Sequence, residues 1–206
     1  MISPLNVVAI ALGALAFWTC IGVAVTRQLL PRSLALPMAP TVGWAVHSAL
    51  AYPLFCVIGF SQVGVLVVAV LALAAGIAAR RIEIATPEPD GPRVPAWALA
   101  AAALLAIAPA IALLPKSVGD GVILAGPIYD HTKIAMIDEM ARLGVPPGNP
   151  FVGGDAGAGR LVYYYLFHFS AAELALAFGV KGWAADVAMT WVAAFASLAT
   201  MMGLAG

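Results

Sequence analysis

Side chains that could carry acid–base or phosphate chemistry gather in one polar stretch of the 206-residue chain, residues 116–162. Nine of the twenty formally charged residues lie between Lys116 and Arg160. Asp130 and His131 are adjacent near the middle of this stretch. A carboxylate there could serve as a general base or a metal ligand, and partial loss of water at a membrane surface would make it a stronger base. Asp130 and His131 are therefore the candidate catalytic residues.

Asp130 also has a structural interpretation, as the residue that begins a helix. Residues 129–143 repeat apolar side chains at helical spacing, which predicts an amphipathic helix with a polar side formed by His131, Asp138, Glu139 and Arg142. An aspartate at a helix start routinely accepts a backbone N–H. Spacing alone favours this capping role, although both roles can coexist. We expect the helix to lie flat on a bilayer, apolar side down.

The other charged residues of this helix have ordinary explanations. Asp138 and Arg142 are four residues apart, which predicts an exposed ion pair worth about 0.3 to 0.5 kcal/mol. His131 could simply be solvated. The neighbouring carboxylates of Asp138 and Glu139 point about 100° apart, so we do not expect them to share a metal ion. A divalent metal ion is a candidate cofactor without an assigned ligand set.

Ionisable and aromatic residues follow where the chain becomes apolar again. The run Tyr163, Tyr164 and Tyr165 suits an interfacial aromatic belt, but three in a row cover about 200° of a helix, so at least one should face the protein interior. His168 follows one turn after Tyr164. At helical rise, Glu173 would lie about 15 Å deep, near the centre of a bilayer.

Glu173 and His47, which lies in an earlier apolar run, each allow two interpretations. An ionisable group deep in a membrane is costly and indicates function by default. The alternative is a protonated glutamate that is hydrogen-bonded to a neighbouring helix.

The overall composition predicts a membrane protein. The chain is 63% hydrophobic and 10% charged, with a mean hydropathy of +1.00, whereas soluble domains have about 45 to 50% apolar and about 25% charged residues. A spanning helix needs about 20 apolar residues. The apolar runs are residues 5–25, 41–60, 63–79, 97–114, 163–180 and 184–206. We therefore expect an all-α polytopic membrane bundle of about six transmembrane helices, with one amphipathic helix in a long outer loop.

Charge distribution bounds the partners and the orientation. The net charge is zero and the ten basic residues are scattered, which excludes a nucleic-acid partner. The bilayer itself is an expected partner. Basic residues near positions 27–32, 80–93 and 181 mark alternate connections, which are expected in the cytoplasm, so the loop 116–162 is expected on the extracytoplasmic side of a bacterial inner (plasma) membrane.

The same pattern divides the chain into two expected parts. Residues 1–95 would form an amino-terminal three-helix membrane segment with a cytoplasmic connector, and residues 96–206 would begin a second membrane module. The last run lacks a flanking charge or aromatic anchor, so we expect the chain to be the front part of a longer one. Cys20 and Cys56 fall in apolar runs and are expected to be small buried groups.

The order of features in residues 127–200 resembles the start of the GT-C glycosyltransferases, membrane enzymes that use polyprenyl-phosphate-linked sugars. The matching features are the sequence Pro-Ile-Tyr-Asp-His at 127–131, the amphipathic helix, the Gly/Pro turn at 144–150, and the aromatic-rich stretch 161–169. The three tyrosines, with the upstream Asn-Pro and Gly-Gly, also look like the YYY membrane proteins of that superfamily. The family commonly has a second acidic residue where this chain has His131.

The resemblance implies transfer of a sugar from a lipid-linked donor to an acceptor hydroxyl at the outer membrane face. Asp130 would accept the proton of the acceptor hydroxyl. Lys133, Arg142 or Arg160 would neutralise the phosphate leaving group, and the tyrosines at 163–165 with His168 would complete the substrate-binding set.

A transporter or flippase is the alternative, with Glu173, His168 and His47 as an intramembrane polar path. A structural subunit without chemistry would leave the charged loop unexplained. The sequence does not indicate the sugar, the acceptor or the oligomeric state.

Overall fold

A computed structural model describes residues 4–82, 91–119, 121–123, 129–149, 159, 161 and 166–205, with the backbone alone at positions 4, 117, 122, 129 and 130. The helices and strands are, in chain order, α1 (Pro4–Leu29), α2 (Arg32–Ile58), α3 (Gln62–Ala79), α4 (Ala96–Leu105), α5 (Ile107–Ala112), β1 (Lys116–Val118), β2 (Gly121–Ile123), α6 (Tyr129–Leu143), α7 (Leu166–Phe178) and α8 (Gly182–Ala205).

Four of these helices are long and apolar enough to cross a membrane: α1, α2, α3 and α8. The 24 residues of α8 extend for about 36 Å, more than the thickness of a hydrocarbon core. Many of their large apolar side chains are exposed on the isolated chain, above all along α3. The expectation of an integral membrane protein built from long apolar helices is confirmed.

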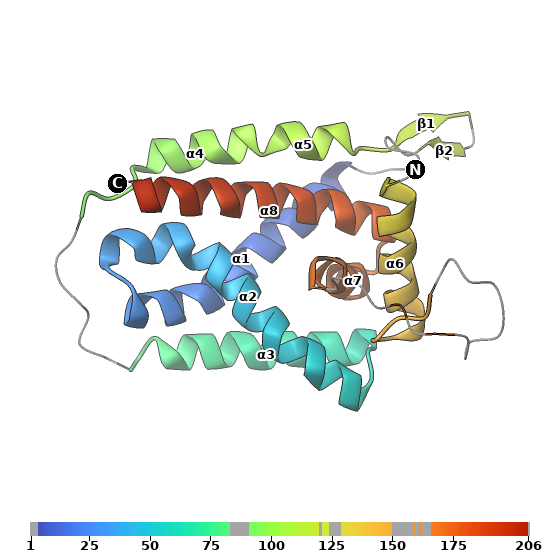
Figure 1. The fold of residues 1–206 in the computed structure, drawn as a ribbon, viewed down its shortest axis with the longest axis horizontal. Coiled ribbons are helices and arrows are strands. Elements are labelled where there is room, and N and C mark those ends of the chain that lie inside the picture. Colours follow the sequence, from blue (N-terminus) through green and yellow to red (C-terminus); the bar gives the residue numbers. More distant parts are fainter. Residues whose placement is uncertain are drawn as a thin grey trace.

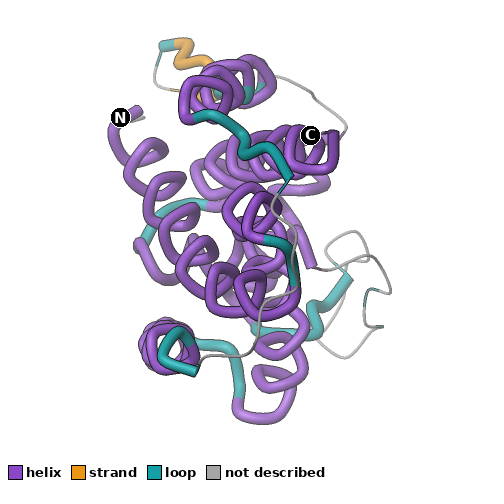
Figure 2. The backbone as a smooth tube through the Cα atoms, turned by 90° about the vertical axis from the view of Figure 1, so that its left-hand side faces the viewer, coloured by secondary structure: helices purple, strands orange, loops and turns teal. Residues whose placement is uncertain are grey.

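In Figure 1, α3 and α8 run in the same general direction, α1 and α2 lie obliquely between them, and α6 lies across one end. Figures 1 and 2 agree in placing α4 and α5 at one edge of the molecule and α3 at the opposite edge. Between these edges, α1 and α2 pack against each other and against α8. We call the end that α6 covers the α6 end.

The fifth apolar run does not follow the long helices. α7 has 13 residues, about 20 Å, and Figure 1 shows it nearly end-on while α8 lies in the plane of the picture. The depth estimate for Glu173 assumed a helix along the membrane normal, so that estimate is wrong. Residues 162–165, which include the three tyrosines, lie outside the described residues.

Because α7 lies crosswise, the chain does not cross to the opposite end along it, and α8 starts at the α6 end. The backbone N–H of Gly182 bonds to Asp138 of α6, so Lys181 lies at this end as well. The prediction that Lys181 shares a side with Arg27, Arg32 and Arg93 is therefore wrong. Those three arginines line one cavity at the opposite end, between the last turn of α1 and the first turn of α2.

Two helix boundaries near prolines differ from the sequence prediction. α2 starts at Arg32, not near position 41, and continues through Pro37 and Pro40. The fourth run is instead divided into α4 and α5. Pro109 cannot donate to the carbonyl of Leu105, and its ring would clash with that carbonyl, so α4 ends at Leu105.

Glycines allow α1 and α2 to cross at close range. A Cβ on Gly22 would lie 1.8 Å from the Ala39 carbonyl oxygen, and one on Gly43 would lie 1.8 Å from the Trp18 carbonyl oxygen. No side chain fits at either position. The crossing therefore depends on small residues, as membrane helix pairs often do.

A short antiparallel hairpin, β1–β2, is the part of the fold that the all-α prediction omits. Lys116 pairs with Ile123 and Val118 with Gly121. Gly119 takes a positive φ of 57° in the turn, a conformation that glycine adopts without steric cost.

Candidate functional site

α6 packs by its apolar side onto protein and not onto lipid. Met136, Ile137 and Met140 are fully buried, and the helix contacts α7 and α8. These are among the apolar residues whose spacing predicted a helix over 129–143, and a helix is present over those residues. The surface beneath it is the start of α8 and the side of α7, which corrects the expectation that its apolar side faces the bilayer.

Asp138 joins α6 to α8. Its Oδ1 accepts the backbone N–H of Gly182 at 2.8 Å, and a Cβ on Gly182 would lie 2.6 Å from the same oxygen. The first N–H groups of a helix have no partner within it, and a carboxylate there also suits the helix dipole. The predicted Asp138–Arg142 pair is therefore wrong: the Arg142 guanidinium bonds to Glu139 at 2.6 Å.

Lys133 makes a second link between α6 and α8. Its ammonium lies 3.9 Å from a carboxylate oxygen of Asp186, a residue that is 2% exposed. Sequence reasoning missed Asp186, although an acid inside an apolar run is the same signal that drew attention to Glu173. A buried carboxylate requires a cation or hydrogen-bond donors nearby, so Lys133 has a structural role at this end.

The remaining predicted residues of the α6 end are only partly described. His131 is exposed on the first turn of α6, and His168 is buried on α7. The side chain of Asp130, together with Arg160 and the tyrosines at 163–165, lies outside the described residues. Within the described part of the chain, no group of three His, Cys, Asp or Glu side chains could hold a metal ion.

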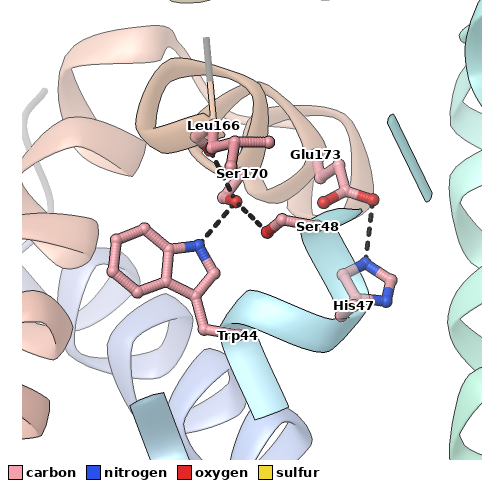
Figure 3. Close-up of polar contacts among 6 residues, drawn as sticks. All are labelled: Trp44, His47, Ser48, Leu166, Ser170 and Glu173. Atoms are coloured by element: carbon pink, nitrogen blue, oxygen red, sulfur yellow. Dashed lines mark hydrogen bonds and ion pairs between the residues drawn. The ribbon is translucent and has the colours of Figure 1, made fainter. Parts of the chain in front are cut away.

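A second polar cluster joins α2 to α7 in the interior. His47 Nε2 and Glu173 Oε1 are 3.0 Å apart, and both residues are 6% exposed (Figure 3). The Phe17 ring and the imidazole pack nearly perpendicular to each other, with centroids 4.9 Å apart. The sequence singled out both ionisable residues without indicating that they meet.

Ser170 holds the same two helices together one turn earlier on α7. The Trp44 indole N–H donates to Ser170 Oγ at 2.8 Å, Ser48 Oγ lies 3.0 Å away, and Ser170 Oγ donates to the Leu166 carbonyl at 2.9 Å (Figure 3). These bonds use the full capacity of one hydroxyl. Small polar residues within apolar runs were the feature of the sequence that could have predicted a polar contact between these two helices.

Comparison with known proteins gives one relative. The chain is similar to the uncharacterized protein y4nK of Sinorhizobium fredii (strain NBRC 101917 / NGR234), with 30% identity over 208 aligned residues. The alignment covers 100% of this chain and 31% of y4nK, so the chain spans about a third of that relative's length. No family model matches the chain. No solved structure matches it.

The geometry thus defines two places for chemistry. At the α6 end, the helix α6, whose first turn contains Asp130, is fixed to α8 by Asp138 and Lys133. In the interior, a carboxylate and an imidazole share a hydrogen bond between α2 and α7. The two places use different residues, so substitutions can test them separately.

Proposed function

We propose that this chain contributes to a membrane glycosyltransferase that moves a sugar from a polyprenyl-phosphate donor to an acceptor hydroxyl at the extracytoplasmic face. The observation that carries the proposal is the position of α6, across one end of long apolar helices (Figure 1). A donor with a lipid tail and a charged head needs its reactive group held where apolar helices end, and Asp130 occurs in the first turn of α6.

The polar contacts of α6 support a rigid base for such a site. Asp138 and Lys133 fix the helix to α8 at two points about one turn apart. In the proposed reaction, Asp130 takes the proton of the acceptor hydroxyl as that oxygen attacks the anomeric carbon, and the lipid phosphate leaves.

The cations divide into two roles in this proposal. Lys133 is held near the buried Asp186, so we assign it to positioning α6 and not to the leaving group. Arg142 has a side chain that is 66% exposed and a partner, Glu139, on its own helix. Arg142 and Arg160 are therefore the proposed phosphate-binding residues, since a guanidinium can bind a phosphate with two parallel hydrogen bonds.

The test is Asp130→Asn, introduced into the complete reading frame that encodes this chain. Isolated membranes would be supplied with radiolabelled polyprenyl-phosphate sugars, and transfer to endogenous acceptors would be counted. Loss of transfer with unchanged membrane expression is expected. Full transfer by this variant would refute the assignment.

Asp138→Asn provides a matched control on the same helix. It makes the same chemical change, and an asparagine oxygen can still accept the Gly182 N–H. Transfer should therefore be retained by Asp138→Asn and lost by Asp130→Asn.

Transport is a second candidate, which the buried His47–Glu173 pair favours. His168, the third residue of the expected path, does not line the cavity beside that pair. If Glu173→Gln abolished the function in cells while Asp130→Asn did not, transport would replace glycosyl transfer.

A further inference from the structure

A cavity lies beside the His47–Glu173 pair, between four helices. It has a volume of about 150 Å³ and is lined by residues of α1, α2, α3 and α7. Apart from His47, Glu173 and the indole of Trp18, its lining is apolar, with Phe17, Val65 and Phe178 among the contributors. The pair thus faces a small apolar space.

Two buried polar atoms in this lining have no hydrogen-bond partner among the described residues: Glu173 Oε2 and Trp18 Nε1. Glu173 is 6% exposed and Trp18 is 1% exposed. Leaving such atoms unsatisfied is energetically unfavourable, and they are rare enough to require an explanation. By contrast, the nearby Ser170 hydroxyl, which also joins α2 to α7, makes all of its possible hydrogen bonds, as expected for a purely structural contact.

The charge state of the pair follows from its apolar surroundings. A net charge buried without compensation costs several kcal/mol. A neutral imidazole beside a carboxylate would leave the pair negative. An imidazolium beside a protonated carboxyl group, which holds two more protons, would leave the pair positive. With one proton it is neutral, whether the proton is on the carboxylate or makes the histidine an imidazolium beside a carboxylate.

We propose that His47 and Glu173 form an intramembrane proton-binding site that holds one shared proton and exchanges it with water that enters the cavity beside the pair. The bond of 3.0 Å between Nε2 and Oε1 lets the two groups share that proton. The free oxygen Oε2 lets Glu173 gain or lose it without breaking the bond to His47. This inference is independent of the glycosyl-transfer proposal.

Among the described residues, His47 and Glu173 are the ionisable groups that line this cavity. The described cavity residues from α1 and α3 are uncharged, α2 contributes His47, and α7 contributes Glu173. His168 on α7 and Asp186 on α8 are also buried, but neither lines the cavity.

Infrared difference spectroscopy on the protein in lipid vesicles tests the site, with the proton as the probe. Spectra would be recorded between about pH 5 and about pH 9, a range that includes the ordinary titration of histidine. A band from a protonated carboxyl group should appear as the pH falls. Glu173→Gln should remove it. His47→Gln should make it appear at a higher pH, because a buried carboxylate that has lost the imidazole beside it is less stable.

Two further measurements keep the outcome decisive. Glu139→Gln makes the same change on α6 and should leave the band in place. Wild-type protein containing ¹³C-labelled glutamate should show the band shifted, which tests the site without any substitution. A band that does not shift with the label, that survives Glu173→Gln, or whose pH dependence is unchanged by His47→Gln would overturn the proposal.

Discussion

The α1–α2 crossing provides a quantitative test of the fold through Gly22→Ala. An alanine Cβ there would lie 1.8 Å from the Ala39 carbonyl oxygen and 2.8 Å from the Gly43 nitrogen. Ordinary contacts of a Cβ begin at 3.4 Å. The two backbones must therefore separate by more than 1 Å at the most extensive helix–helix contact in the described part of the chain.

Overpacking of this kind typically costs about 1 to 3 kcal/mol, and the upper end applies here because the obstructing atoms belong to the backbone. For a chain of this size, about 3 kcal/mol corresponds to a melting temperature lower by about 6 to 12 °C. The assay is thermal unfolding in detergent followed by tryptophan fluorescence, since Trp18 lies at the crossing.

Gly76→Ala is the matched control. The nearest atom to its added Cβ would be the Ile21 Cα at 3.4 Å, an ordinary contact, so α3 should accept alanine and gain up to about 1 kcal/mol of helix propensity. A melting temperature for Gly22→Ala equal to that of Gly76→Ala would refute the close crossing.

Two other predictions concern polar contacts and use the same thermal assay. Lys133→Met should destabilise the protein by about 2 to 3 kcal/mol, because Lys133 faces the buried Asp186. Arg142→Met should destabilise it by less than about 1 kcal/mol, because the Arg142 side chain is mostly in solvent. Equal losses of stability would contradict the assigned contacts. Ser170→Ala should cost about 1 to 3 kcal/mol and alter the fluorescence of Trp44, whose indole N–H loses its acceptor; an unchanged spectrum and stability would contradict the bond.

The long helices could be predicted because apolar runs of sufficient length leave few alternatives. Their boundaries were less predictable where proline was involved. Pro37 and Pro40 were expected to precede the second apolar helix but lie within α2. Pro109 was expected to lie within one continuous helix, but the structure divides that run into α4 and α5. Packing of neighbouring helices decides which missing backbone hydrogen bond is tolerated, and that packing is not a local property of the sequence.

The crosswise direction of α7 was also beyond local sequence reasoning. The apolar run around Glu173 has the composition of a spanning helix, but its partners on α2, α6 and α8 determine its direction. The hairpin at 116–123, by contrast, had a readable signal: Gly119 and Asp120 between residues of strand-forming type are a favoured two-residue turn.

Within the candidate sites, the sequence identified residue types better than their partners. On α6, Met136, Ile137 and Met140 are buried and His131, Asp138 and Arg142 are exposed, as the periodicity predicted, but Leu143 is exposed as well. The periodicity could not show that Asp138 caps α8, because Gly182 is 44 residues away. The meeting of His47 with Glu173 is likewise a contact over 126 residues.

The central claim is that α6 lies on the extracytoplasmic face, and cysteine accessibility tests it most directly. Cys20 and Cys56 would be replaced by alanine, and His131→Cys on the exposed side of α6 would be compared with Arg81→Cys at the far end of α3. A membrane-impermeant maleimide applied to intact cells should label the cysteine at position 131 but reach position 81 only after the membrane is opened. Labelling in the reverse order would place α6 in the cytoplasm and contradict the account.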